Sequence, residues 1–349
     1  ADLRRGGAHF QGGARARGDG GAPIRQLRIT FRSSTVPDRI DFKGLIPAIA
    51  VPFTDDFGID TAGLTRFARW LAGQRGIKAL MTNGHTGEVF SLTPAERAEV
   101  TRITVAAVAG RVPVISSLVC EGISDAVAQA VLAKQAGAAA LDVMPPHHWL
   151  RFGFRPRHVL DYFRAVGDAS GLPLVVHVYP AWTKASFSSE LLADLARLDC
   201  VQAFKIGTRE MNKYARDLRA IRAVAPDKAL LTCHDEYLLA SMVQGVDGAL
   251  VGFASLIPGL IQELLEAVAA GDLRRAMSVQ AQIDPLKEAV YGDGEPTGEA
   301  HACMKAAMAA AGIFDRGTVR PPTIAPSPDE LKRIVAAVRG AGIASRPAA

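Results

Sequence analysis

The chain has 349 residues, 49% of them hydrophobic, which suits one large α/β barrel or two medium-sized domains. No apolar run approaches the ~20 residues of a membrane span, which argues against a membrane partner. Residues 1–42 hold eight arginines and four aspartates, whereas residues 43–349 hold 32 basic and 31 acidic side chains. Most of the net charge of +5 therefore comes from residues 1–42. Residues 43–349 are nearly neutral and lack the excess of basic residues expected of a protein that binds nucleic acid.

Residues 1–42 are rich in glycine and arginine and show neither a helical nor a strand period. An arginine-rich, acid-poor leader is typical of a transit peptide, but the glycine pairs at 6–7, 12–13 and 20–21 disfavour an amphipathic helix. No apolar core of a signal peptide is present. We expect a flexible or accessory N-terminal extension, in which residues 24–31 are a candidate strand.

From Gly44 onward, short apolar runs typical of strands alternate with amphipathic helical patterns. The runs predict strands over residues 44–53, 77–83, 112–119, 138–144, 172–179, 201–207, 228–233 and 247–253. The helical patterns between and after them cover residues 61–74, 94–109, 123–135, 156–168, 188–198, 209–224, 236–244 and 257–270. Thr93 is placed as the N-cap of the second helix, with Glu96 at the capping-box position.

Eight strands that alternate with eight helices predict a (β/α)8 TIM barrel over residues 43–270. A doubly wound open sheet is the alternative, but eight regular units with short links favour closure. Three further helical patterns, at residues 273–291, 299–311 and 328–340, predict a C-terminal helical appendage within residues 271–349. The four cysteines, Cys120, Cys200, Cys233 and Cys303, are widely spaced, so we expect free thiols in a cytoplasmic protein.

Reactive residues of such barrels lie at the carboxyl ends of strands or in the loops that follow them. Polar groups follow or end five of the predicted strands: residues 83–88, His147 with His148, His177 with Tyr179, Lys205, and His234 with Asp235. Leu250 in the eighth strand is expected beside them. These residues are far apart in sequence, yet the fold places all of them on one rim.

Lys205 lies in the apolar sixth strand between Phe204 and Ile206. Burial there would remove much of its hydration, and desolvation favours the neutral form of an amine. A neutral amine is what Schiff-base chemistry on a ketone requires. The alternative is an ordinary lysine whose stem packs in the strand while its charge reaches water.

The turn after the second strand places His85 and Thr86 between two glycines, Gly84 and Gly87. Glycines let the backbone approach a ligand closely, and exposed N–H groups can hold a carboxylate. An ordinary glycine-rich turn has the same pattern. We interpret Glu88 as a structural carboxylate that bonds the loop backbone rather than as an acid catalyst.

These residues resemble a known family. Gly84–Glu88, with the following Phe90-Ser91-Leu92-Thr93-x-x-Glu96-Arg97, is similar to the signature of the dihydrodipicolinate synthase / N-acetylneuraminate lyase family. The segment 204–207 resembles the strand of its Schiff-base lysine, and residues 319–322 resemble its closing segment. The resemblance extends from about residue 44 to residue 340. It implies a (β/α)8 barrel with C-terminal helices, usually assembled as a homotetramer.

The chemistry that the resemblance implies is that of a class I lyase. Lys205 would form an imine with pyruvate or a related 2-oxo acid, with no separate cofactor and no metal. Thr86 and a proton relay would complete the catalytic set. Backbone groups at Gly84, His85 and Thr86 would hold the carboxylate of the substrate. Further substrate contacts would come from His147, Tyr179, Trp182 and Leu250.

Several positions depart from the family pattern. His177 stands where the family has the tyrosine of its proton relay, although Tyr179 two residues later can point to the same interior. His147 occupies the position of another tyrosine of the family, and His85 occupies the position of the first hydroxyl residue of the turn. Trp182 occupies the place of the arginine that anchors the second substrate of dihydrodipicolinate synthase. We therefore expect a divergent lyase, an aldolase or dehydratase, that is not a true dihydrodipicolinate synthase.

Histidine can move protons near neutral pH, so these replacements are compatible with imine chemistry in which His177 is the relay. Each histidine can also be an ordinary packed, hydrogen-bonded imidazole. A different class of chemistry would use His85, His147 or His148, and His177 as metal ligands, although their spacing matches no common metal motif. A third interpretation is a non-catalytic barrel that binds a 2-oxo acid as a sensor.

Overall fold

The computed structural model describes residues 40–180, 183–292 and 298–343. The chain divides into two units, residues 1–33 and 34–349. The first unit, which holds the candidate strand at residues 24–31, lies outside the described residues, as does Trp182. Within the part that is described, no helix is long and apolar enough to cross a bilayer.

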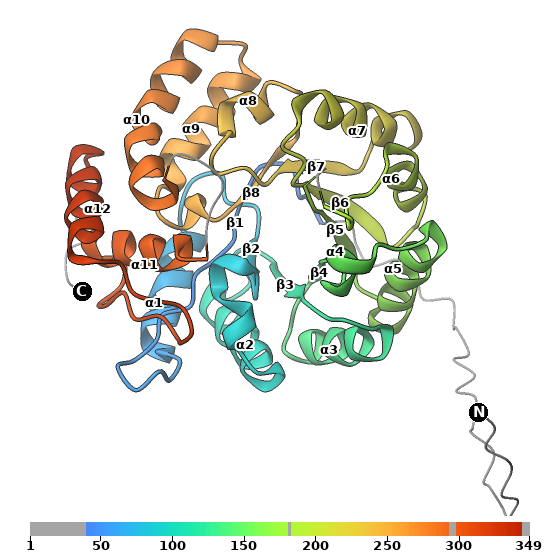
Figure 1. The fold of residues 1–349 in the computed structure, drawn as a ribbon, viewed down its shortest axis with the longest axis horizontal. Helices are drawn as coiled ribbons and strands as arrows, with labels where there is room; N and C mark the ends of the chain where they lie inside the picture. Colours follow the sequence, from blue (N-terminus) through green and yellow to red (C-terminus); the bar gives the residue numbers. More distant parts are fainter. Residues whose placement is uncertain (1–39, 181–182, 293–297, 344–349) are drawn as a thin grey trace, which may run out of the picture. The chain divides into compact units, whose positions relative to one another are not determined.

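The second unit is built on eight parallel strands in the order β1-β8-β7-β6-β5-β4-β3-β2 (Figure 1). Single bridges join Leu45 to Ile77 and Ala48 to Met81, so the two edge strands meet and the barrel is nearly closed. This arrangement confirms the predicted TIM barrel. The strands are β1 (Leu45–Pro47), β2 (Leu80–Thr82), β3 (Val114–Leu118), β4 (Ala140–Val143), β5 (Leu174–Val178), β6 (Val201–Ile206), β7 (Ala229–Thr232) and β8 (Gly248–Val251).

Helices surround the strands, as Figure 1 shows. They are α1 (Thr61–Ala72), α2 (Pro94–Val108), α3 (Ile123–Gln135), α4 (His148–Phe152), α5 (Pro156–Ser170), α6 (Ser189–Ala196), α7 (Met211–Val224), α8 (Leu238–Met242) and α9 (Pro258–Ala269). The predicted C-terminal helices are α10 (Leu273–Tyr291), α11 (Ala300–Ala310) and α12 (Pro328–Gly340), which contact one another, while α10 also packs on α9.

Local chemistry explains where several helices begin. The Thr93 hydroxyl accepts a hydrogen bond from the Glu96 amide, and the Glu96 carboxylate accepts one from the Thr93 amide. This capping box confirms the predicted start of α2. Short helices in the loops, namely α4, η1 (His85–Gly87), η2 (Val89–Ser91) and η3 (Phe253–Ser255), were not predicted, because segments of three to five residues show no periodicity.

Side chains alternate across each strand and create levels inside the barrel. Ile115, Ala140, Val175 and Ala203 on β3 to β6 belong to one buried apolar cluster in the barrel interior. Their strand neighbours, such as Leu141, Val176 and Phe204, belong to the cluster between the strands and the helices. Two residues further along each of these four strands, a polar side chain therefore points into the barrel interior. These residues are Ser117, Asp142, His177 and Lys205.

Candidate active site

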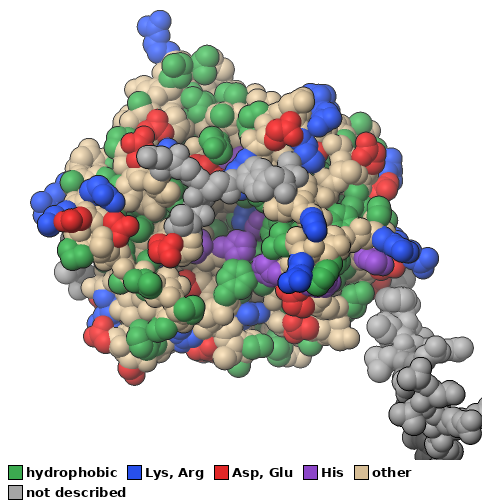
Figure 2. All heavy atoms as spheres, in the orientation of Figure 1, with side chains coloured by type: hydrophobic (Ala, Val, Ile, Leu, Met, Phe, Trp, Pro, Cys, Tyr) green, Lys and Arg blue, Asp and Glu red, His purple; other side chains and the backbone are tan. Residues whose placement is uncertain are grey.

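A cavity of about 350 Å³ opens at the carboxyl ends of the strands. Seven of the nine predicted site residues line it: His85, Thr86, His147, His177, Tyr179, Lys205 and Leu250. Figure 2 shows histidine side chains gathered in the hollow at the centre of this face. Gly84 is not among the lining residues, and Trp182 lies outside the described residues.

Lys205 lies on β6 with only 8% of its surface exposed. Its partner in the ladder between β5 and β6 is His177. Leu250 from β8 and Ala48 from the segment after β1 provide apolar surface in the same cavity. The lysine side chain is therefore buried in the strand layer and reaches the cavity.

His177 is bordered by a buried carboxylate that the sequence analysis did not single out. Its Nδ1 atom lies 3.5 Å from Oδ2 of Asp142 on β4, and the Ser117 hydroxyl donates to the same oxygen at 2.5 Å. Burial, and then the charge of Lys205, lower the pKa of His177 despite the opposing influence of Asp142. Burial would raise the pKa of Asp142, but His177, Lys205 and Ser117 hold it below its ordinary value.

His85 lies on the short helix η1 and stacks on Phe90, with ring centroids 5.3 Å apart. Its ring centroid is 5.9 Å from that of His177. Burial, followed by the charges of His177 and Lys205, lowers the pKa of His85 well below the ordinary value. A neutral imidazole therefore stands where the family resemblance led us to expect a hydroxyl.

Tyr179 and His147 are joined directly, since the tyrosine hydroxyl lies 3.2 Å from Nε2 of His147. Glu121 accepts the backbone N–H groups of His147 and His148 at 3.0 and 2.8 Å, and its carboxylate also lies 3.3 Å from Nδ1 of His147. Burial, with Asp142 and Glu121 nearby, raises the pKa of Tyr179. The hydroxyl of Tyr179 therefore stays protonated beside a histidine that a carboxylate orients.

Thr86 lies against the loop that follows β8. A Cβ atom placed on Gly252 would lie 2.7 Å from the Thr86 hydroxyl and 3.1 Å from Oδ2 of Asp235. Asp235 accepts the N–H groups of Gly252 and Phe253 and, at 2.8 Å, the hydroxyl of Tyr291. Burial raises the pKa of Asp235 to about 6. Only glycine at position 252 lets the threonine and the aspartate approach this loop together.

Four cavity residues that the sequence analysis did not select are charged or titratable groups from later segments: Arg209, Glu236, Tyr291 and His301. Arg209 and Glu236 form an ion pair at the cavity wall. Burial, and then Lys205 and Lys305, lower the pKa of His301 to about 4. Tyr291 and His301 come from α10 and α11, so the C-terminal helices form part of the wall of the cavity.

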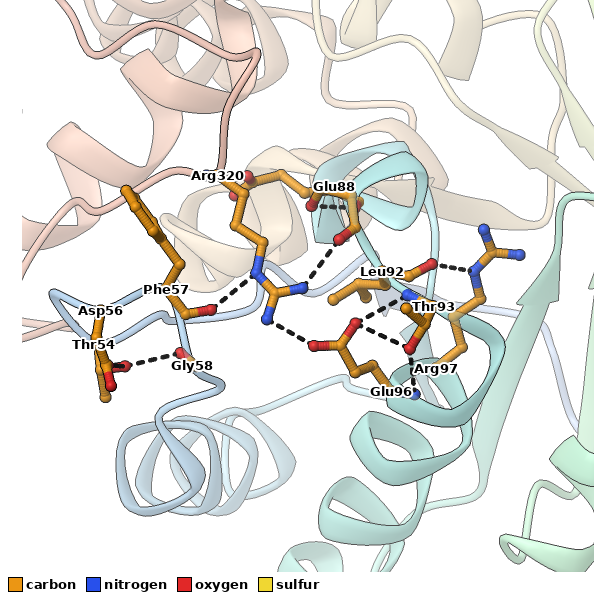
Figure 3. A network of polar contacts seen from close by, with 11 residues as sticks. Thr54, Asp56, Phe57, Gly58, Glu88, Leu92, Thr93, Glu96, Arg97 and Arg320 are labelled. Carbon is orange, nitrogen blue, oxygen red and sulfur yellow. Dashed lines mark hydrogen bonds and ion pairs between the residues drawn. The ribbon is translucent and has the colours of Figure 1, made fainter.

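Glu88 joins the turn after β2 to the C-terminal segment. Its carboxylate accepts from Nζ of Lys305 at 2.6 Å and from the Arg320 amide at 3.2 Å, rather than from its own loop. Arg320 also donates to the carboxylate of Glu96 at 2.7 Å and to the carbonyl oxygen of Phe57 at 2.9 Å (Figure 3). Glu88 is therefore a structural carboxylate, and it joins segments that are distant in sequence.

The histidines within the described ranges do not form a three-ligand metal site. Among residues 40–180, 183–292 and 298–343, no three His, Cys, Asp or Glu side chains are grouped closely enough to hold one metal ion. The geometry within these ranges therefore gives no support to the alternative of a histidine-bound metal.

Residues 41–341 match the family model described as the dihydrodipicolinate synthetase family. An uncharacterised DapA-like lyase of Thermofilum pendens is 31% identical over 237 residues, which are 68% of this chain and 77% of that protein. A 4-hydroxy-tetrahydrodipicolinate synthase of Acidiphilium cryptum is 30% identical over 257 residues, which are 73% of this chain and 85% of that protein.

Solved structures share the fold. A dihydrodipicolinate synthase from Aquifex aeolicus aligns with a TM-score of 0.78 at 22% identity and covers 87% of this chain and 100% of its own. YagE, a prophage protein of the same family from E. coli K12 solved with pyruvate, also has a TM-score of 0.78 at 22% identity. That alignment covers 86% of this chain and 99% of the YagE chain.

Proposed function

The chain belongs to the dihydrodipicolinate synthetase family of lyases, and from this premise we propose that it acts on pyruvate or a related 2-oxo acid through a Schiff base on Lys205. The observation that carries the proposal is the place of Lys205, which is buried at the cavity in register with His177. A relative of the same fold was solved with pyruvate, which supports this substrate class.

In the proposed reaction, Nζ of Lys205 adds to the carbonyl carbon of the 2-oxo acid. The carbonyl oxygen takes up one proton from the amine and one from solvent and leaves as water, and a protonated C=N bond forms. His177 then removes a proton from the neighbouring carbon, and the electron pair of that C–H bond forms an enamine. The enamine makes or breaks a carbon–carbon bond to a second carbonyl, as in an aldolase. In a dehydratase the enamine instead expels a hydroxyl from the next carbon, and this hydroxyl takes the proton held by His177 and leaves as water.

The turn at Gly84 to Thr86 is proposed to hold the carboxylate of the substrate. His85 and Thr86 line the cavity, and the absence of a Cβ atom at Gly252 leaves room for the Thr86 hydroxyl. Tyr179, oriented by His147, is proposed to bind or protonate oxygen atoms of the substrate. The cavity volume of about 350 Å³ exceeds what a three-carbon acid needs, which leaves space for a second reactant or a longer acid.

We further propose that the chain does not make 4-hydroxy-tetrahydrodipicolinate, although several relatives carry that name. Histidines occupy three positions where the family has tyrosine or another hydroxyl residue: 85, 147 and 177. The position of the family's second-substrate arginine is Trp182, and the cavity arginine Arg209 is paired with Glu236. Product analysis beside an active relative tests this point, and formation of that product at a comparable rate would refute it.

Borohydride trapping tests the central step. Protein is incubated with pyruvate and sodium borohydride, which reduces an imine to a stable secondary amine, and peptides are analysed by mass spectrometry. We expect the added mass at Lys205 and not at Lys184, a rim lysine that bonds to the Arg151 carbonyl. A panel of longer 2-oxo acids then ranks the substrates. Absence of any adduct at Lys205 with the whole panel would overturn the proposal.

The resemblance also implies a homotetramer, which remains a proposal for this chain. Light scattering coupled to size-exclusion chromatography measures the mass of the assembly. A mass four times the 36.9 kDa of one chain is expected, and a concentration-independent monomer would contradict it.

A further inference from the structure

Asp142 is a charged residue in a place where barrels usually have branched apolar side chains. It lies in β4, is 0% exposed and is the ladder partner of Ser117 on β3. Its partner on β5 is Val175, two residues before His177. Removing a carboxylate from water costs several kcal/mol unless partners compensate, so its burial needs an explanation. The residues on either side of it, Leu141 and Val143, are the ordinary apolar residues of a strand.

We propose that Asp142 is a positioning residue for His177. Its carboxylate holds the imidazole with the hydrogen on Nδ1, which leaves Nε2 as the base that faces the cavity. This inference rests on the proposed Schiff-base function and adds a residue that the family resemblance does not supply.

The geometry of the pair is the first support. Nδ1 of His177 lies 3.5 Å from Oδ2 of Asp142, within ion-pair distance, and among the described residues this buried nitrogen has no hydrogen-bond partner. The Ser117 hydroxyl donates to the same Oδ2 at 2.5 Å and so helps to fix the carboxylate. Catalytic hydrogen bonds are often long in unliganded sites and shorten when substrate binds, so a small rotation completes this contact.

The charges give the second support. The pKa of Asp142 is held below its ordinary value by His177, Lys205 and Ser117 in spite of burial, so the carboxylate is ionised at neutral pH. Burial lowers the pKa of His177, so the imidazole is neutral before reaction. An ionised carboxylate only accepts hydrogen bonds, so the nitrogen that faces it carries the hydrogen of the neutral ring.

The pair then acts in the proton step. When Nε2 of His177 takes the proton from the carbon next to the imine, the ring becomes an imidazolium beside Asp142. The proton stays on the imidazole, while the carboxylate stabilises the new positive charge without becoming protonated. Return of that proton to carbon restores the neutral ring, so the step consumes no other reactant.

Exchange of the pyruvate methyl protons in D2O, followed by NMR, measures this proton step without a second substrate. We expect the wild-type protein to catalyse the exchange and Asp142→Asn to slow it by about 10²–10⁴-fold, the range typical of general acid–base catalysis. The amide can donate to Nδ1 and so favours the opposite tautomer. The borohydride adduct at Lys205 should still form in Asp142→Asn after long incubation.

Two comparisons separate positioning from a structural role. Asp217→Asn also removes a fully buried carboxylate, but this residue bonds to Lys213 and Ser189 outside the cavity lining, so exchange should keep the wild-type rate. In the background of His177→Gln, Asp142→Asn should add less than about a threefold further loss, because residues that act as a unit are not additive. A multiplicative loss in the double variant would show that Asp142 does not act through His177.

The pH dependence of exchange is a further test, because a purely structural role of Asp142 would leave the pH profile unchanged. Asp142 raises the pKa of His177, so its replacement should move the acid limb of the profile to lower pH. The other titratable or charged groups around His177 are unchanged in this comparison: Lys205 and Arg209 from β6 and its loop, His85 from η1, and Tyr179, which directly follows β5. An acid limb that stays in place would count against the pairing.

The outcomes distinguish this inference from the function on which it rests. If wild-type protein gives no adduct at Lys205, the proposed function fails. If both proteins give the adduct and exchange at equal rates, the function stands and the role of Asp142 is refuted. If Asp142→Asn does not fold, Ser117→Ala replaces it, since this change keeps both members of the pair but releases the carboxylate. We then expect a smaller loss of exchange, and a wild-type rate would overturn the inference.

Discussion

His177 and Lys205 are direct partners in the parallel ladder between β5 and β6. Their side chains leave adjacent strands at the same level and on the same face, because strand residues alternate between the two faces. An imidazole therefore stands beside the amine at a position fixed by backbone hydrogen bonds and not by a loop.

Lys205→Arg should abolish the borohydride adduct, because a guanidinium does not add to a ketone at neutral pH. Turnover of any 2-oxo acid that the wild-type protein converts should fall to background. Lys184→Arg is the matched control, since Lys184 is an exposed rim lysine that bonds to a carbonyl. A persistent adduct in Lys205→Arg, located at another lysine, would show that the wrong amine has been assigned.

The rate of methyl proton exchange should fall in acid with a midpoint below about 6.5, the ordinary pKa of histidine. The reason is that burial lowers the pKa of His177, so the ring stays neutral and able to accept a proton until the pH falls further. Rates measured from pH 4.5 to 8.5 give the midpoint. His158→Gln, which changes an exposed histidine on α5, should leave the profile unchanged, whereas a midpoint above 7 would contradict the assignment.

Gly252→Ala should raise the KM for pyruvate by about tenfold, because overpacking of this kind typically costs about 1–3 kcal/mol. The new methyl group would lie 2.7 Å from the Thr86 hydroxyl and displace it from the cavity. Gly259→Ala is the control, since a Cβ there meets nothing within 4 Å and the residue lies in helix α9. An unchanged KM in Gly252→Ala would remove Thr86 from the set of substrate contacts.

Lys305→Met should lower the free energy of unfolding by about 3–5 kcal/mol, because it leaves the Glu88 carboxylate buried without its cation. Both side chains of this pair are almost fully buried, with a separation of 2.6 Å. Lys332→Met breaks an exposed pair with Asp329 and should change the stability by less than about 0.5 kcal/mol. Denaturant titrations of the two variants measure the difference, and equal stabilities would refute it.

The sequence predicts the barrel well because its strongest signals are local. Alternation of apolar runs and helical patterns gives all eight strands, and the bounds of α3, α10 and α12 agree with the predicted residues. The predicted strands are longer than the observed ones, since apolar residues continue past the last ladder partner into the loops. At β1, for example, residues 44–53 are apolar in pattern, whereas the ladder extends over Leu45–Pro47.

Several residues of the cavity and its surroundings could not be predicted, because the residues that they contact are distant in sequence. Asp142 stands inside an apolar run, and nothing local shows that Ser117 and His177 will meet it. Tyr291 and His301 belong to helices beyond the last strand, where the rule about strand ends does not apply. Glu121 was overlooked for a similar reason, since its contacts to His147 and His148 depend on the loop after a different strand.

The ion pair between Glu88 and Lys305 also bears on the order in which the chain is made. All eight strands have been synthesised once Val251 has been added, but the cation that neutralises Glu88 comes 54 residues later, at position 305. A nascent barrel that closes before α11 has emerged would bury a carboxylate without its partner, which is costly. The ribosome-bound chain should therefore keep the turn after β2 open to solvent until the C-terminal helices arrive.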